Sequence, residues 1–168
     1  MKKERETIFL NALEENQEKL FRVCSIYSKD HEDAKDLFQE VLVHVWKSMA
    51  SFEGNSSLST WMFRIALNVC LRFKSIHTKH QHKLIRLDSI TIAHFGSEEK
   101  SAGENEKLIS LRKCVKQLNE GDKAVVALYL EGLAYREISN ILGLSENNVA
   151  VKVKRIKSKL LNCINEIL

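Results

Sequence analysis

Basic and amide side chains line one face of the last helix that the sequence predicts. Residues 136–160 read REISNILGLSENNVAVKVKRIKSKL: a short helix, a turn containing Gly143, and a second helix with Ser145 at its N-cap position. This order is typical of a helix-turn-helix, whose second helix enters the major groove of DNA. The candidate DNA-binding residues on that helix are Asn147, Asn148, Val151, Lys152, Lys154, Arg155 and Lys159.

These residue types suit base recognition. Arginine bonds guanine in a bidentate manner, lysine reaches guanine or phosphate, and a small apolar side chain can touch a thymine methyl group. The alternative is a basic amphipathic helix within an ordinary bundle. Because turn, cap and polar face all agree, the pattern favours DNA binding.

A second group of residues could bind unpaired nucleic acid. Residues 51–59, SFEGNSSLS, form a predicted loop, and a helix follows it over about 60–75. The candidate residues are Phe52, Asn55 and Ser56 in the loop and Trp61, Arg64, Asn68 and Arg72 along one edge of the helix. Aromatic rings stack on unpaired bases while nearby cations hold phosphates. On the residues alone, a solvated loop beside a half-buried Trp61 is supported equally well.

An acidic face is predicted on the helix over residues 31–49. It carries Asp36, Gln39, Glu40, Val43 and Lys47. Val43 there is an apolar centre within a charged rim, as in a protein interface. Taken alone, the same pattern is more typical of a solvated helix face.

Histidines suggest a metal site only weakly. His77, His80 and His82 are close in sequence, and Glu40 and His44 have helical ligand spacing, but neither set comes with the further ligands a site needs. The sequence also lacks a phosphate loop and a G-x-S-x-G nucleophile motif. We therefore predict no metal, no cofactor and no enzymatic activity. A small metalloenzyme is the alternative that metal analysis would exclude.

Composition predicts that helices position all of these residues. The 168 residues include no proline and six glycines, which favours an all-α fold. Helices are expected over about 8–27, 31–49 and 60–75, and four more in the last third. Two small helical domains are expected, over residues 1–82 and 107–168. A polar linker over 83–106 joins them, and the C-terminal domain is a four-helix unit with the helix-turn-helix.

The distribution of charge indicates the binding partners of the chain, and its cysteines indicate the cellular compartment. The net charge of +4 is modest, but 64–86 and 147–165 contain basic residues and no acid, which suggests two nucleic-acid contacts. Cys24, Cys70, Cys114 and Cys163 have no C-x-x-C pairing, so we expect free thiols in a reducing cytoplasm. No segment has the pattern of a signal peptide or a membrane span.

Three blocks resemble extracytoplasmic-function (ECF) sigma factors. Residues 33–46, DAKDLFQEVLVHVW, look like the polymerase-binding helix of that family. Residues 52–68, FEGNSSLSTWMFRIALN, resemble the loop and helix that open and read the minus-ten promoter element in that family, and 118–160 resemble the domain that reads the minus-thirty-five element. The blocks make up about half of the chain and occur in the family's order. The sequence of residues 146–160, ENNVAVKVKRIKSKL, is similar to the corresponding segment in sigma factors that are common in Bacteroidetes.

The resemblance implies a role for each block. Asp36, Gln39, Glu40 and Val43 would face the clamp helices of the largest subunit of core RNA polymerase. The loop 52–59 would capture a flipped base of promoter DNA, and Trp61, Arg64 and Asn68 would support the melted strand. Val151, Lys154 and Arg155 would lie at base edges, with Lys152 and Lys159 on phosphates.

The resemblance also implies a regulator and leaves rivals. No extension follows the second DNA-binding domain, so control by a separate anti-sigma factor, usually membrane-bound in this family, is expected. Ala150 and Val151 stand where many members have a basic or hydroxyl residue, which leaves the base preference open. The rivals are a conventional helix-turn-helix regulator and an adaptor that binds proteins only.

Overall fold

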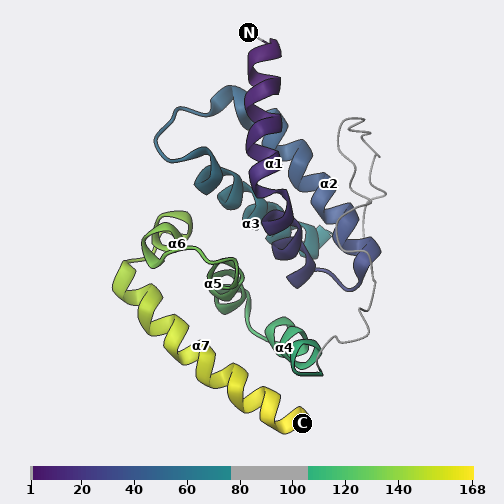
Figure 1. The fold of residues 1–168 in the computed structure, drawn as a ribbon, viewed down its shortest axis with the longest axis vertical. Coiled ribbons are helices and arrows are strands. Elements are labelled where there is room, and N and C mark those ends of the chain that lie inside the picture. Colours follow the sequence, from purple (N-terminus) through teal and green to yellow (C-terminus); the bar gives the residue numbers. More distant parts are fainter. Residues whose placement is uncertain (1, 77–105) are drawn as a thin grey trace. The chain divides into compact units, whose positions relative to one another are not determined.

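The structure, a computed structural model, describes residues 2–76 and 106–168 (Figure 1). All regular elements in these two ranges are helices, so the predicted all-α fold is confirmed. They are α1 (Lys2–Ile26), α2 (His31–Ser48), the short 3-10 helix η1 (Met49–Ser51), α3 (Leu58–Ile76), α4 (Glu106–Lys116), α5 (Glu120–Leu130), α6 (Tyr135–Leu142) and α7 (Glu146–Ile167). None of these helices is long and apolar enough to cross a membrane.

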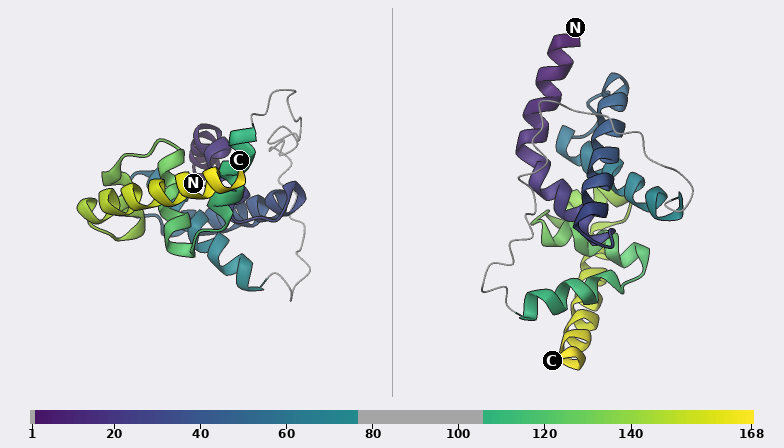
Figure 2. Two further views of the ribbon diagram at one scale, coloured as in Figure 1. Left: turned by 90° about the horizontal axis from the view of Figure 1, so that it is seen from below. Right: turned by 90° about the vertical axis from the view of Figure 1, so that its right-hand side faces the viewer.

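The chain divides into two compact units, residues 1–97 and 98–168. In the first unit, α1, α2 and α3 pack against one another (Figures 1 and 2). The apolar stripe of α2 supplies much of its core, where Leu37, Phe38 and Leu42 are fully buried. Burying each such side chain contributes roughly 1.5–3 kcal/mol to stability. The amphipathic pattern therefore fixes which face of α2 stays on the surface.

Local signals set where the helices begin. Asp30 caps α2, its side chain accepting a hydrogen bond from the Asp33 backbone N–H. At α3, the hydroxyl of Ser57 accepts the Thr60 backbone N–H at 3.1 Å, so this helix begins two residues before the predicted Thr60. Helix α1 begins at Lys2, earlier than the predicted start near residue 8. The segment before that start is rich in Lys, Glu and Arg, which are strong helix formers.

In the second unit, α4, α5 and α6 pack along α7 (Figures 1 and 2). Helix α6 ends at Gly143, whose φ of 71° is a left-handed conformation that glycine adopts without strain. Ser145 then caps α7 by accepting the Asn148 backbone N–H at 3.1 Å. Ile138, Val149 and Ile156 are buried where α6 and α7 meet the core. The predicted helix-turn-helix is confirmed as α6, its glycine turn and α7.

The cysteine expectation is wrong for one pair. Cys114 of α4 and Cys163 of α7 form a disulfide, with Cα atoms 6.0 Å apart, while Cys24 and Cys70 are free and buried. The two bonded cysteines are 49 positions apart, so their contact depends on how α4 packs on α7. Helical periodicity along the sequence does not contain that information.

Reduction of this disulfide is expected to destabilise the second unit. The bond closes a 49-residue separation and restricts the unfolded chain, which typically stabilises a fold by about 2–4 kcal/mol. Thermal unfolding followed by circular dichroism, with and without a thiol reductant, measures the effect. The Cys163→Ser variant is the control, because reductant should leave its melting temperature unchanged. Equal melting temperatures for the oxidised and reduced native chain would contradict the expectation.

Candidate nucleic-acid interface

One side of α7 carries the predicted DNA-binding residues. Its inward stripe, Val149, Val153, Ile156 and Leu160, is buried against the rest of the unit. The opposite side exposes Asn147, Asn148, Val151, Lys154 and Arg155. Val151 is 55% exposed although it is apolar. An exposed valine can touch a thymine methyl group, and the amides and cations around it can bond to base edges.

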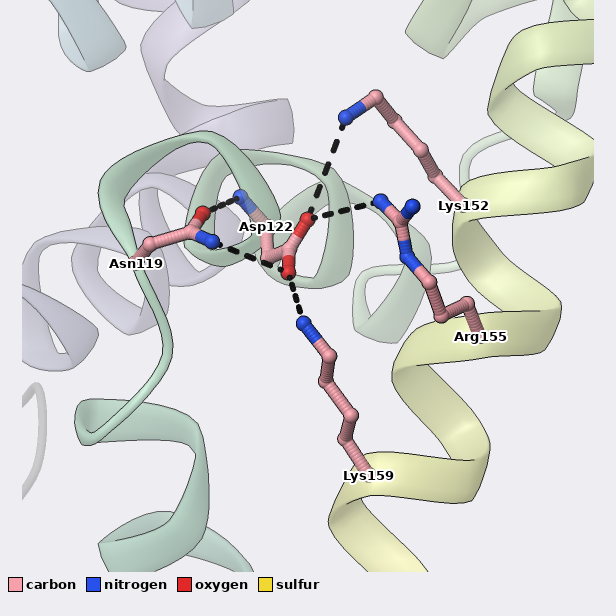
Figure 3. A network of polar contacts seen from close by, with 5 residues as sticks. All are labelled: Asn119, Asp122, Lys152, Arg155 and Lys159. Atoms are coloured by element: carbon pink, nitrogen blue, oxygen red, sulfur yellow. Dashed lines mark hydrogen bonds and ion pairs between the residues drawn. The ribbon is translucent and has the colours of Figure 1, made fainter.

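Arg155 of that face and the flanking Lys152 and Lys159 form a row that shares one carboxylate, Asp122 of α5 (Figure 3). The Lys159 Nζ lies 3.0 Å from Asp122 Oδ2. Arg155 and Lys152 reach Asp122 Oδ1 at 3.7 and 4.0 Å. We call these four residues the Asp122 cluster. It brings three predicted DNA-binding residues together around an acid that the sequence interpretation missed.

The N-terminus of α5 holds the carboxylate of this cluster. Asn119 caps the helix by accepting the Asp122 backbone N–H at 2.8 Å, and its amide donates to Asp122 Oδ2 at 3.3 Å (Figure 3). Asp122 also lies in the first turn of α5, where the helix dipole favours a negative charge. No local pattern links Asp122 to cations 30 to 37 residues later in the chain. The helical spacing of residues 152, 155 and 159 does indicate that the three cations lie on one side of a helix, but it does not indicate their acidic partner.

In the first unit, the loop before α3 is anchored by aromatic packing. Phe52 and Trp61 are both half-buried, with ring centroids 5.0 Å apart. Between them the chain bends at Gly54, whose φ is 76°, and exposes Asn55, while Ser56 is half-buried. The pair thus joins the two ends of the loop, and the half-buried Trp61 is compatible with both sequence interpretations.

Along α3, the predicted edge changes from half-buried to exposed. Trp61 and Arg64 are half-buried, whereas Asn68 and Arg72 are exposed. Elsewhere in the first turn of α3, the Asn16 amide of α1 donates to the partly buried Ser59 hydroxyl at 3.0 Å. This contact ties the first turn of α3 to α1. The edge therefore sits on a helix whose start is held firmly.

The acidic face of α2 is accessible. Asp36 is exposed, and Gln39, Glu40 and Val43 are half-buried. Glu40 lies 3.8 Å from the His44 ring nitrogen Nε2. Burial lowers the pKa of His44 below its ordinary 6.5, Arg72 and Lys47 lower it further, and Glu40 opposes them. The lowered pKa favours the neutral form of His44, so this side chain adds less positive charge to the acidic face.

The lowered pKa of His44 predicts that the stability of the fold depends on pH. A lowered pKa in the folded chain means that the unfolded chain binds the proton more readily. His44 thus contributes stability above its unfolded pKa, and this contribution is lost as pH falls through the folded pKa. NMR titration of the native chain should place the His44 midpoint below 6.5, with a His44→Gln spectrum identifying its signal. A midpoint at or above 6.5 would contradict the assigned burial effect.

The three histidines considered as metal ligands, His77, His80 and His82, lie outside the residues that the structure describes. The expectation that they bind no metal therefore stays a prediction. Among the residues that the structure does describe, no group of three or more His, Cys, Asp and Glu side chains could hold a metal ion.

Two family models match the chain, one in each unit. The model "Sigma-70 region 2" matches residues 12–79, and "Sigma-70, region 4" matches residues 108–160. The first match includes the acidic face, the loop and the edge of α3. The second includes the Asp122 cluster and the helix-turn-helix. Both units are therefore of the sigma-70 type.

Two similar proteins are also RNA polymerase sigma factors, in agreement with the family matches. The chain is 29% identical over 131 residues to the RNA polymerase sigma factor YlaC of Bacillus subtilis, covering 77% of this chain and 76% of YlaC. It is 25% identical over 142 residues to the ECF RNA polymerase sigma factor SigM of Mycobacterium tuberculosis, covering 84% and 69%. The chain belongs to the ECF group of the sigma-70 family of RNA polymerase sigma factors. The resemblance to Bacteroidetes versions stays a prediction.

Two solved structures share the fold. CnrH, in complex with the cytosolic domain of CnrY, aligns with a TM-score of 0.69 and 18% identity over 96% of this chain and 90% of CnrH. The sigma factor RpoE, in complex with the anti-sigma factor NepR from Bartonella quintana, aligns with a TM-score of 0.64 and 20% identity, over 97% and 98%. At these identities the likeness concerns the fold.

Proposed function

We propose that this chain joins core RNA polymerase, recognises a promoter with both helical units and stabilises the opened minus-ten region. It acts in the cytoplasm by binding alone, with no catalytic site of its own. The observation that carries the proposal is the presence of sigma-70 regions 2 and 4, in that order, on one helical chain. Functionally, residues 1–82 and 107–168 act as two modules that residues 83–106 connect.

Helix α7 reads the minus-thirty-five element. Val151, Lys154 and Arg155 contact base edges, and Asn147 and Asn148 lie at the end of the helix that enters the groove. Lys152 and Lys159 hold phosphates. The exposure of the outward face and the cap at Ser145 support this assignment.

The loop and α3 bind the melted strand. Phe52, Asn55 and Ser56 belong to the loop that captures a flipped base, at a cost of a few kcal/mol for unstacking. Trp61, Arg64, Asn68 and Arg72 support the strand, since stacking on an aromatic side chain contributes roughly 1–3 kcal/mol per base. The Phe52–Trp61 contact supports this reading because it fixes an aromatic platform beside an exposed loop.

The acidic face of α2 binds polymerase. Asp36, Gln39, Glu40 and Val43 contact the clamp helices of the largest subunit, and the accessible negative charge of this face supports the assignment. An anti-sigma factor is a further proposed partner. It is suggested by two proteins of the same fold, CnrH and RpoE, whose structures contain CnrY and the anti-sigma factor NepR.

Joining two modest DNA contacts on one polymerase explains how such a small chain selects a promoter. Once one module is bound, binding of the second module becomes effectively intramolecular. The overall affinity for the promoter then exceeds that of either module alone. Both contacts include phosphates, so binding should weaken steeply as salt rises.

The experiment compares DNA binding by the chain alone and by the chain with core polymerase. A sigma factor should copurify with core polymerase, and promoter-specific binding should depend on that association. A conventional helix-turn-helix regulator would bind its duplex unaided and would not copurify. Specific duplex binding of equal strength with and without core polymerase would therefore favour the regulator.

A further inference from the structure

The Asp122 cluster suggests a role beyond neutralising charge. We propose that Asp122 is a positioning residue for DNA recognition: its carboxylate holds Lys152, Arg155 and Lys159 in a row that aligns α7 with its site, with Lys152 and Lys159 meeting phosphates and Arg155 meeting a base edge. This inference rests on the proposed function of α7. Asp122 belongs to a different helix, α5, and its side chain is buried.

The accessibility of the four residues differs in the direction that positioning requires. The Asp122 side chain is 3% exposed, whereas those of Lys152, Arg155 and Lys159 are 25%, 54% and 48% exposed. The carboxylate is thus an internal anchor, and the cations extend from it towards solvent. One negative charge among three positive charges leaves an excess of positive charge on the surface, which attracts phosphates.

The anchor also has a fixed direction. Its Oδ2 atom meets both Lys159 and the Asn119 amide, while Oδ1 faces Arg155 and Lys152 (Figure 3). Lysine and arginine have long side chains with many rotamers, and three cations without an anion would repel one another. Holding them in place before DNA arrives reduces the ordering cost of binding.

Positioning and screening predict opposite results when the charge of Asp122 is removed. If the carboxylate only screens the cations, its loss strengthens binding to every DNA, because non-specific affinity follows charge. If it positions them, its loss weakens binding to the promoter, whose phosphates must meet the cations in one register. Binding to unrelated DNA then stays the same or strengthens.

The test measures binding of the full-length chain, assembled with core polymerase, to two duplexes. One is a promoter duplex recovered by transcription, and the other is a scrambled duplex of equal length and composition. The Asp122→Asn variant should lose about tenfold in promoter preference, within the range of couplings between contacting residues. Its affinity for the scrambled duplex should not fall. The Asp122→Glu variant, which keeps the charge, should recover most of the preference.

Two further variants separate the possible causes. Glu166→Gln removes one negative charge from an exposed position on the same α7, so it matches the charge change and should leave the preference unchanged. Asn119→Ser replaces the capping amide oxygen with a hydroxyl that can also cap the helix, but removes the amide N–H that donates to Asp122. It should lower promoter preference without changing any charge, and it provides the test if Asp122→Asn does not fold.

The outcomes distinguish this inference from the proposed function. Equal gains on both duplexes would mean that Asp122 only screens charge, and equal losses on both would mean a purely structural role. Either result overturns the inference, as does unchanged preference in both Asp122→Asn and Asn119→Ser. If the native chain with core polymerase shows no promoter preference, the proposed function itself fails.

Discussion

Trp61→Ala and Asn68→Ala are each expected to reduce promoter opening while leaving polymerase binding nearly unchanged. Both residues lie on the edge of α3 that we assign to the melted strand, and neither belongs to the acidic face of α2. Loss of one stacked base costs roughly 1–3 kcal/mol, so opening should fall about tenfold for Trp61→Ala. Permanganate reactivity of unpaired thymines measures opening, and a core-binding titration measures assembly.

Two controls make this comparison specific. Trp61→Phe keeps an aromatic ring next to Phe52 and should retain much of the opening. Asn11→Ala makes the same change as Asn68→Ala at an exposed position of α1 and should have no effect. If opening and polymerase binding fall together in the α3 variants, these residues do not act on melted DNA.

Reversing charge on the acidic face is expected to disrupt assembly with polymerase. Asp36→Arg combined with Glu40→Arg replaces two negative charges by two positive ones, and like charges across an interface cost several kcal/mol. We therefore expect polymerase affinity to fall by at least about tenfold. Fluorescence titration of labelled chain with core polymerase measures the change.

A matched control exists on α1. Glu14→Arg combined with Glu18→Arg changes the same charge at the same helical spacing on exposed residues. It should leave polymerase affinity unchanged. If the α2 variant also binds normally, or if both pairs weaken binding equally, the acidic face is not the polymerase contact.

The elements that could be predicted are those governed by short-range patterns. The core-facing stripe of α2 consists of apolar residues at helical spacing, and its buried members are Ala34, Leu37, Phe38, Val41, Leu42 and Val45. The turn between α6 and α7 follows from Gly143 and Ser145, whose roles depend on backbone geometry within a few residues. These same patterns placed the outward face of α7 correctly.

The features that escaped prediction depend on packing between distant segments. Asp122 meets Lys159 across 37 positions, and Cys114 meets Cys163 across 49. Both contacts require α7 to lie along α5 and α4, which periodicity does not specify. Nothing in the local sequence sets Asp122 apart from other acidic residues near a helix start, or pairs Cys114 with one of the other cysteines. Their chemistry is therefore a consequence of tertiary structure.

Transcription in vitro shows directly whether this chain acts as a sigma factor. Core RNA polymerase is supplied with a promoter library, with and without this chain, and the transcripts are sequenced. A sigma factor should confer initiation at start sites that share two spaced upstream elements, and transcription from those sites should be absent with core polymerase alone. If the chain binds DNA but neither associates with core polymerase nor confers initiation, the account is contradicted and the conventional regulator takes its place.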